Sequence, residues 1–313
     1  FCSDGLDPSD ITNIGHIDHC VRESIKLGMN PIDAICMASR NCFDYYKMGN
    51  EFGGIGPGKI ADILILDDYK KIKINKVILG GKIVISDGKL VQQFHTPKVP
   101  AWMKKTVKIP KLYPKFFNVN SKNTDETVKT ILMKTEIVTQ KNTSNLDVKD
   151  SNVVASYDKD IWKVAALDRT FGSKTHAVGF LENFGADIGA FASTWSFHEN
   201  DMIVIGSNEN DMADACNKLT KSQGGLIIVK DGKTLASLPF QLGGIISTDP
   251  IEKVTKNFTK INDVLSDSGC KFKKPHLIPL FLPFLALPDI RILYSGIVDV
   301  KSRSFIPTIQ TNL

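Results

Sequence analysis

The chain has 313 residues, of which 42% are hydrophobic and 23% charged, a balance typical of a globular protein with about two domains. Its 39 basic and 34 acidic residues are dispersed and leave a formal net charge of only +5, so we expect no nucleic-acid partner. Since it contains no run of eighteen apolar residues and no basic segment leading into an apolar stretch, we expect no membrane partner and no signal peptide.

The cysteines and the first residue of the chain predict its cellular compartment and its completeness. The six cysteines include no CxxC pair, which favours a reducing compartment, and we therefore expect a cytoplasmic protein. The chain begins with Phe1 rather than methionine, in what resembles the end of a strand. We therefore expect a fragment of a longer protein or a truncated gene product.

The first hundred residues change from a helical to a β pattern. From Phe1 to about Met48, apolar residues recur mostly every three or four positions, which predicts two helices after a strand end. Pro31 suits the first turn of the second helix. From Gly53 to about Val91, short β-branched runs are separated by turn signals such as Gly80-Gly81 and Asp87-Gly88. This pattern predicts a small antiparallel β unit.

The rest of the chain divides into a polar stretch and a second domain. From about His95 to Asp160, prolines, lysines and then other polar residues predict a long connection in which Ile131–Val138 is one candidate strand. From Trp162 to about Pro307, strand and helix patterns alternate, which predicts an α/β or α+β domain. Its clearest elements are strands at Met202–Gly206 and Gly225–Val229 and helices at Asn210–Ser222 and Pro250–Ser268.

Asp4 is the first candidate functional residue. It ends the opening segment Phe1–Asp4 and is followed by Gly5 and an Asp7-Pro8 helix start. A carboxylate at the C-terminal end of a barrel strand lies where (β/α)8 enzymes hold their catalytic groups, and it could there ligate a metal and transfer a proton. The local pattern alone favours a solvent-exposed turn residue or a helix cap.

Two histidines follow in Gly15-His16-Ile17-Asp18-His19. Their spacing puts both on one face of a helix if Ile14–Lys26 is helical. They could ligate a metal or face a substrate. Without a third ligand nearby, a local hydrogen-bonding role with Asp18 is an equal alternative.

The second domain concentrates polar residues after apolar runs, at Asp168-Arg169 and at Ser193–His198. Asp168 and Arg169 favour a structural ion pair over a site, and a lone His198 is more typical of a hydrogen-bonded histidine than of a catalyst. No GxSxG sequence occurs, which excludes the usual serine hydrolase elbow. Gly53–Ile60 imitates a phosphate-binding loop but lacks the hydroxyl that would follow its lysine.

Several longer segments occur in a specific order. The first part of the chain contains FCSDGLDP, GHIDHCVRESIKLGMNPIDAICMASRN, GIGPGKIADILILDD and VILGGKIV. The second part contains DRTFGSKTHAVGFLENFG, GAFAST, IVIGSNENDMADACNKL, GGLIIVKDGKTLASLPFQLGG and FLALPDIRI. The first set resembles the end of the amidohydrolase superfamily in its adenine deaminase branch, and the second set resembles the C-terminal domain of bacterial adenine deaminases.

The resemblance implies an α/β protein with four parts. Residues 1–50 would be the C-terminal end of a (β/α)8 amidohydrolase barrel, with its eighth strand and the following helices. Residues 51–95 would belong to a small flanking β-sandwich, and residues 96–160 would form a largely polar linker. Residues 161–313 would be the α/β or α+β adenine deaminase C-terminal domain.

The resemblance also implies an activity. It is the hydrolytic deamination of adenine to hypoxanthine and ammonia, a step of adenine catabolism in purine metabolism, by a metal-dependent hydrolase that uses manganese or else iron or zinc. A metal-bound hydroxide would attack the carbon that bears the amine. The implied partners are a small-molecule purine substrate and, by analogy only, further copies of the same chain in a homo-oligomer.

The resemblance gives the candidate residues their roles. Asp4 matches the aspartate of the eighth barrel strand, which in this superfamily ligates the metal and takes the proton of the attacking water. The residues that would support Asp4 or face the substrate are Ser3, His16, Asp18 and His19. The candidates in the C-terminal domain are Asp168, Arg169 and His198.

The chain also departs from the family. It lacks the HxH pair, since no two of its six histidines are separated by one residue, so we expect that it cannot build the metal site or act alone. Thr170 and Phe171 stand where many adenine deaminases carry histidines, and of a later histidine cluster His198 alone remains. These losses leave two alternatives open, an amidohydrolase for another cyclic amine or amide and an inactive remnant that serves in assembly.

Overall fold

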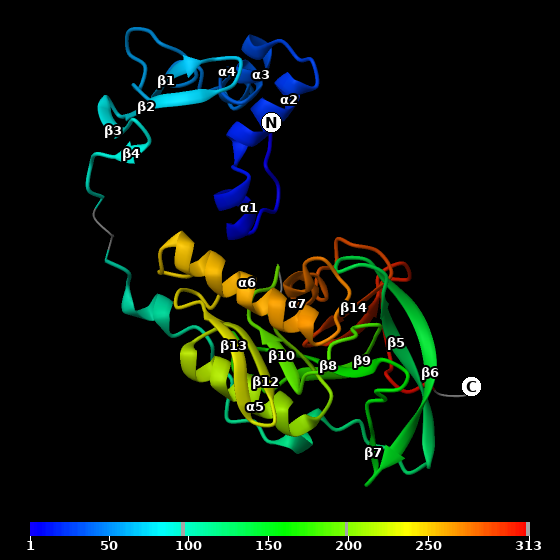
Figure 1. Ribbon diagram of the computed structural model, residues 1–313. Helices are drawn as coiled ribbons and strands as arrows, with labels where there is room; N and C mark the ends of the chain where they lie inside the picture. Colours follow the sequence, from blue (N-terminus) through cyan, green and yellow to red (C-terminus); the bar gives the residue numbers. More distant parts are fainter. Residues whose placement is uncertain (95–97, 198–199, 311–313) are drawn as a thin grey trace. The chain divides into compact units, whose positions relative to one another are not determined.

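The chain folds into two compact units. A computed structural model describes residues 1–94, 98–197 and 200–310, and its units comprise residues 1–98 and 99–313 (Figure 1). Both combine helices with sheets, which confirms the mixed α/β class. Within the described ranges, no helix has the length and apolar character needed to cross a bilayer.

Short helices open the first unit, and they differ from the predicted pair. Phe1–Asp4 forms no strand, because no strand of the described chain pairs with it. The Phe1 ammonium instead donates a hydrogen bond of 2.8 Å to the Met37 carbonyl. The predicted helix from Ile14 begins only at Ile17, because Gly15 has a φ of +117°, outside the helical region. The helices are α1 (Pro8–Asn13), α2 (Ile17–Lys26), α3 (Pro31–Met37) and α4 (Arg40–Tyr45).

An antiparallel four-stranded sheet completes this unit and confirms the predicted β unit. Gly80-Gly81 and Asp87-Gly88 join its strands, and all four residues have positive φ angles between 52° and 79°. Positive φ at both central residues gives the turn whose twist matches that of hairpin strands. The strands are β1 (Ile63–Asp68), β2 (Lys73–Leu79), β3 (Lys82–Ser86) and β4 (Lys89–Leu90), in the order β1-β2-β3-β4.

The second unit is organised by a nine-stranded sheet, part of which lies where a polar linker was expected. Asp125–Met133 and Thr139–Lys149 pair along nine residues as an antiparallel hairpin, so the linker prediction is wrong there. All neighbouring strands are antiparallel except β5 and β9. The strand order is β13-β12-β10-β11-β8-β9-β5-β6-β7. The bounds are β5 (Asp125–Met133), β6 (Thr139–Lys149), β7 (Asn152–Val153), β8 (Ile161–Leu167), β9 (His176–Glu182), β10 (Ala190–Ser193), β11 (Met202–Gly206), β12 (Gly225–Lys230) and β13 (Lys233–Pro239).

Helices cover both faces of this sheet (Figure 1). The side chains of β8 alternate between the two faces, so Val164 enters one hydrophobic cluster and Ala165 the other. The first cluster includes α6 (Ile251–Asp267) and α7 (Ile278–Phe281), and the second includes α5 (Glu209–Ser222) and the segment 107–117. Short 3₁₀ turns lie at Ala101–Lys104, Pro114–Phe117 and Pro275–Leu277. These layers confirm the strands and helices predicted for this part of the chain.

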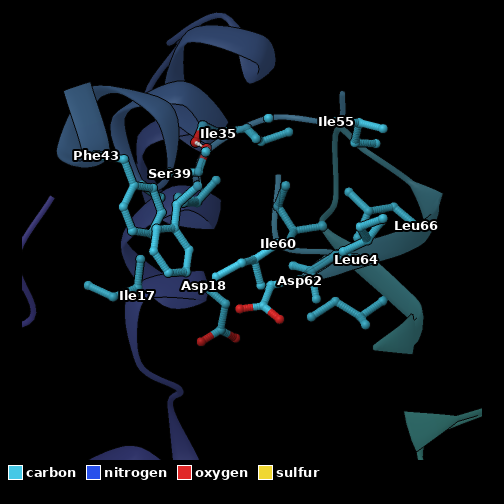
Figure 2. A pocket seen from close by; sticks show the side chains of 18 residues that line it. Ile17, Asp18, Ile35, Ser39, Phe43, Ile55, Ile60, Asp62, Leu64 and Leu66 are labelled. Atoms are coloured by element: carbon cyan, nitrogen blue, oxygen red, sulfur yellow. Dashed lines mark hydrogen bonds between the residues drawn. The ribbon is translucent and has the colours of Figure 1, made fainter. Parts of the chain in front are cut away.

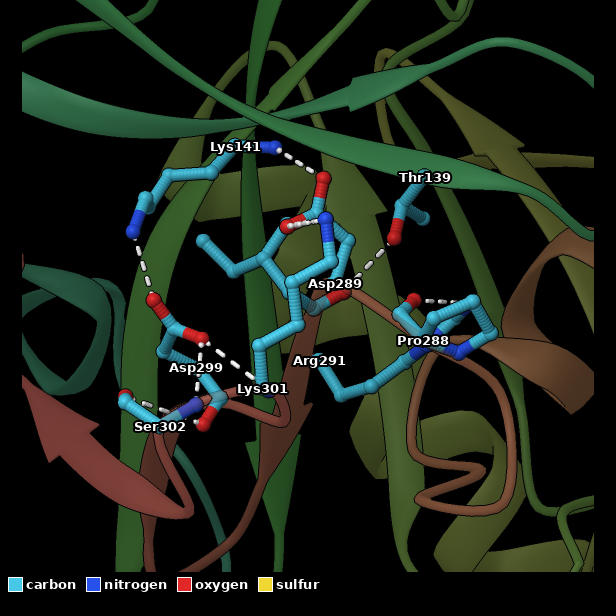
Figure 3. Close-up of polar contacts among 9 residues, drawn as sticks. Thr139, Lys141, Pro288, Asp289, Arg291, Asp299, Lys301 and Ser302 are labelled. Atoms are coloured by element: carbon cyan, nitrogen blue, oxygen red, sulfur yellow. Dashed lines mark hydrogen bonds and ion pairs between the residues drawn. The ribbon is translucent and has the colours of Figure 1, made fainter.

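A small sheet of β14 (Ile290–Leu293), β15 (Gly296–Asp299) and β16 (Ser304–Ile306) is attached to β6 by polar contacts (Figure 3). Lys141 donates its ammonium to Asp299 at 2.5 Å and its backbone N–H to Asp289 at 3.1 Å. Arg291 is 1% exposed, and its guanidinium donates to the carbonyls of Ile137, Phe281 and Pro288. A buried arginine therefore ties three chain segments through their backbone.

Acid sensitivity is expected at Asp299. The hydrogen bond from Lys141, together with the Ser302 amide, lowers the pKa of Asp299 from 3.8 to about 2. The stabilisation is therefore complete above about pH 4 and is lost as the pH falls through about 2. We expect Asp299→Asn to lower the free energy of unfolding at pH 7. Near pH 2 the free energies of unfolding of the variant and the parent should become equal, as measured by denaturant titration at several pH values.

Asp187→Asn, which removes an exposed partner of Lys230, is the control. A loss of unfolding free energy in Asp299→Asn that does not change with pH would contradict this role of the Asp299 carboxylate.

Candidate functional site

Asp4 lies in an exposed loop. Its φ is +53°, in the left-handed region that glycine adopts freely and aspartate adopts more often than most other residues. One carboxylate oxygen accepts the Gly5 amide at 2.7 Å, and the Asp4 amide donates to the Cys2 sulfur at 3.5 Å. The loop thus presents the carboxylate outward and leaves it able to take a further partner.

His16 reaches the Asp4 loop from the start of α2. Its Nε2 lies 3.1 Å from the hydroxyl of Ser3, the residue immediately before Asp4. Ser3 and His16 line a hollow of about 210 Å³. His19 and Cys20 lie on the same hollow. Three of the candidate supporting residues, Ser3, His16 and His19, therefore line one hollow, and Ser3 directly precedes Asp4 in the chain.

Asp18 supports His16 rather than the hollow. Its carboxylate accepts the His16 amide at 2.8 Å and pairs with the Arg22 guanidinium at 2.6 Å. Burial acts to raise the pKa of Asp18, but the His16 amide and Arg22 outweigh it, and the pKa is lowered. His19 faces Glu23 at 3.9 Å, so the two histidines have different partners. Arg22 was not among the predicted residues, although its i,i+4 spacing from Asp18 was a signal.

A metal centre needs more ligands than these residues supply. In the described ranges, no three His, Cys, Asp or Glu side chains form a group that could hold a metal ion. Metals of the class that carboxylates bind take several ligands at once. Asp4 offers one carboxylate, and a metal of this class would need further ligands beside it.

The first unit also contains an apolar groove that the sequence did not predict (Figure 2). Its volume is about 490 Å³. Asp18 and Asp62 lie at its edge, and Figure 2 shows their carboxylates on the same side. The apolar lining comes from both the helices and the β1 region, and includes Ile35, Phe43, Ile55, Ile60, Leu64 and Leu66.

In the second unit, Asp168 has a structural role. Its carboxylate accepts the amides of Thr170, Phe171 and Ser173, and it also accepts the Ser173 hydroxyl at 2.5 Å. Burial acts to raise the pKa of Asp168, but these hydrogen bonds outweigh it, and the pKa is lowered. The ion pair that was expected between Asp168 and Arg169 is therefore replaced by a loop closed on Asp168, because nearby amides satisfy the carboxylate.

Arg169 ties two other loops to the end of β8. It is 3% exposed, and its guanidinium donates to the Gly243 carbonyl at 3.0 Å and to the Asn200 side chain at 3.2 Å. Burial lowers the pKa of Arg169 to about 10, against the opposing charge of Asp201. The remaining candidate of this domain, His198, lies outside the described residues.

A buried ion pair at the start of α5 was also missed. Lys163 is 1% exposed, and its ammonium donates to Glu209 at 2.6 Å, to Asn152 at 2.8 Å and to the Phe117 carbonyl at 3.0 Å. Each ammonium proton therefore has an acceptor. Lys163 lies within the strand Ile161–Leu167, in which every residue is buried. The apolar pattern of this strand therefore gave no sign of a buried charge.

Comparisons with known proteins agree along the whole chain. Residues 136–304 match the family model described as "Adenine deaminase C-terminal domain", and residues 1–91 match the "Amidohydrolase family". An adenine deaminase of Cenarchaeum symbiosum (strain A) is 53% identical over 309 residues, which cover 99% of this chain and 51% of that relative. Adenine deaminases of Desulforamulus reducens and Clostridium botulinum (strain Loch Maree / Type A3) are 33% and 31% identical over 99% and 97% of this chain. The chain spans about half the length of these relatives.

Proposed function

The chain belongs to the adenine deaminase C-terminal domain family. From this premise we propose that the chain catalyses hydrolytic deamination of adenine when it is joined to a segment that corresponds to the other half of its relatives. Water adds at the carbon that bears the amine, the carbon–nitrogen bond breaks, and hypoxanthine and ammonia leave. The observation that carries the proposal is the match along 99% of the chain to an adenine deaminase at 53% identity. The substrate is a small-molecule purine.

We assign Asp4 the proton transfer of this reaction. It lies in the part of the chain that matches the amidohydrolase family. Its exposed carboxylate can accept a proton from water and return it to the departing amine, so that no net proton is consumed at this residue. Ser3 and His16, in contact beside it, hold the loop. His19 lies on the same hollow and is a substrate-side candidate.

The family implies a divalent metal, and we propose manganese, with iron and zinc as the alternatives. Such an ion supplies Lewis acidity and a lowered pKa of water at the reacting centre. Asp4 would be one of its ligands, since carboxylate oxygen suits manganese. The other ligands lie outside the described residues of this chain, in which no metal-binding group occurs. This chain alone is therefore expected to be inactive.

The proposed setting is adenine catabolism in the cytoplasm. The described cysteines are all free thiols, which supports a reducing compartment. We propose a homo-oligomer by analogy with the family. The end of a (β/α)8 barrel at residues 1–50 and part of a flanking β-sandwich at residues 51–95 likewise stay proposals, supported by the amidohydrolase match over residues 1–91.

Ammonia release decides the substrate. The test uses the full-length protein, which is this chain joined to a segment that corresponds to the other half of its relatives. It is incubated with manganese and with adenine, guanine, cytosine or a dihydropyrimidine. We expect ammonia and hypoxanthine from adenine in preference to the others. Turnover of another cyclic amine or amide without turnover of adenine would replace this function with the amidohydrolase alternative. No turnover of any of them would favour an assembly role.

A further inference from the structure

Arg22 connects the end of α1 to the start of α2. Its Nη2 atom lies 2.6 Å from an Asp18 carboxylate oxygen and 3.3 Å from the Ile14 carbonyl. The two side chains of the ion pair are about one third exposed, at 30% for Arg22 and 36% for Asp18. As an isolated surface pair it would contribute little to stability. Its partners instead suggest a local geometric role.

The ion pair packs directly on Gly15. A Cβ atom at this position would lie 2.8 Å from the Arg22 Nη2 atom and 3.0 Å from an Asp18 oxygen. Gly15 also has a φ of +117°, which side chains rarely permit. The backbone angle therefore favours glycine here, and a side chain at this position would also displace the ends of the Arg22 and Asp18 side chains. The pair in turn fixes the turn that separates α1 from α2.

That turn sets the position of His16. The second Asp18 oxygen accepts the His16 amide at 2.8 Å, so the same carboxylate holds both Arg22 and the His16 backbone. The His16 ring then reaches the Ser3 hydroxyl at 3.1 Å. A continuous series of contacts thus runs from Arg22 through Asp18 and His16 to Ser3.

The series ends at the residue that precedes Asp4. Asp4 follows Ser3 directly and has a φ of +53°. The hydrogen bonds of Asp4 to Gly5 and Cys2 are local, so they do not orient the loop against the rest of the unit. Two longer-range contacts do so: the Phe1 ammonium donates to the Met37 carbonyl, and Ser3 contacts His16 thirteen positions away. The contact of Ser3 with His16 is the one that adjoins Asp4.

We propose that Arg22 is a positioning residue that, through Asp18, His16 and Ser3, holds the Asp4 carboxylate in place for the reaction. This inference rests on the proposed function of Asp4. Arg22 touches none of the reacting atoms, so its loss should change the placement of Asp4 rather than the binding of substrate. Small misplacements of a catalytic group are known to lower rates strongly.

The first test compares two arginines in the full-length protein. Arg22→Gln removes the proposed support, and Arg40→Gln is the matched control, because Arg40 also pairs with an aspartate four positions away, Asp44, at 3.4 Å. We expect Arg22→Gln to lower kcat for adenine about tenfold or more with little change in KM, and Arg40→Gln to leave both unchanged. Arg22→Lys keeps the charge, and its kcat should lie between those of the parent and Arg22→Gln. If Arg22→Gln does not fold, Arg22→Lys takes its place in the comparison. Equal kcat values for the two glutamine variants would overturn the inference.

The second test asks whether Arg22 acts through Ser3. If it does, the Ser3→Ala/Arg22→Gln double variant should lose little more kcat than the worse single variant, because both remove the same support. His16→Gln should restore part of the rate that His16→Ala loses, since a glutamine amide can replace the ring nitrogen toward Ser3. Multiplicative losses in the double variant would show separate roles and refute the pathway.

A third measurement separates this inference from the proposed function. If the full-length parent releases no ammonia from adenine, the proposed function fails, and bound manganese per chain then decides the positioning role. We expect Arg22→Gln to retain less manganese than Arg40→Gln after dialysis, because Asp4 would be a displaced ligand. Equal manganese in the two variants would reject the positioning role whatever the substrate.

Discussion

Asp4→Asn in the full-length protein is expected to lower kcat for adenine deamination by about 10²–10⁴-fold, the range that a general acid–base group contributes. Asparagine has nearly the same shape and can still accept the Gly5 amide, so the loop should keep its conformation. It cannot take up a proton at neutral pH, and its amide is a weaker metal ligand than a carboxylate. Ammonia release under saturating adenine, with bound manganese measured in parallel, gives the result.

Asp33→Asn is the matched control for this experiment. Asp33 is an exposed carboxylate in the first turn of α3, in the same unit and outside the hollow beside Asp4. It should leave kcat and manganese content unchanged. Unaltered turnover in Asp4→Asn would remove Asp4 from the mechanism and favour its alternative role as a turn residue.

The largest stability effect is expected at the buried pair of Lys163 and Glu209. Glu209→Ala leaves the Lys163 ammonium buried without its carboxylate, and the remaining acceptors, Asn152 and the Phe117 carbonyl, are neutral. Stranding a buried charge costs about 3–5 kcal/mol. Lys163→Met removes the charge instead, and Glu209, 22% exposed, keeps its bond from Asn152, so we expect a smaller loss of about 1–3 kcal/mol.

Tryptophan fluorescence during denaturant unfolding measures this difference. All three tryptophans, Trp102, Trp162 and Trp195, lie in the second unit, so the signal reports that unit alone. Lys218→Met is the control, since Lys218 pairs with Asp214 on the surface of the same helix and should cost under about 1 kcal/mol. A larger loss in Lys163→Met than in Glu209→Ala would reverse the order and reject the stranded-charge explanation.

The same pair predicts part of the acid response. Burial acts to raise the pKa of Glu209, but the bonds from Lys163 and Asn152 outweigh it, and the pKa is lowered from 4.5. The stabilisation is therefore complete above about pH 4.5 and decreases as the pH falls through the lower folded pKa. The deficit of Glu209→Ala should accordingly diminish below that pH.

Elements with a clear hydrophobic period were predicted well from the sequence. The helices at Glu209–Ser222 and Ile251–Asp267 and the strand Met202–Gly206 appear within one residue of their predicted bounds. Each buries a face or a whole strand against the sheet, so the burial pattern was already present in the residue types. Hairpin turns at Gly80-Gly81 and Asp87-Gly88 were equally clear, because these residues tolerate positive φ.

The hairpin of β5 and β6 could not be predicted in this way. β6 is largely polar, and most of its side chains are exposed. Its position comes from nine backbone pairings with β5 and from contacts of Thr139 and Lys141 with residues about 150 positions away. Backbone pairing leaves little trace in side-chain type, so the segment resembled a polar connection.

At the candidate site, the residue types were predictable and the contacts were not. Asp4, His16 and Asp18 were selected from the sequence, and their roles stay predictions. The contact of His16 with Ser3 was not predicted and is seen only in the structure. The role proposed for Arg22 depends on the positive φ of Gly15 and on the direction of the Asp18 side chain, and neither can be read from the residue types. Asp168 could be selected too, but its closure of a local loop depends on the amides that surround it.

The apolar groove of the first unit has a practical consequence for handling the chain. Leu64, Ile60 and Ile55 remain 53%, 42% and 84% exposed around its lining, so a hydrophobic patch faces water next to a small sheet. Patches of this kind promote association and precipitation. Purification of the isolated chain should therefore benefit from mild detergent and low concentration, and an environment-sensitive dye should fluoresce on the first unit before any denaturant is added.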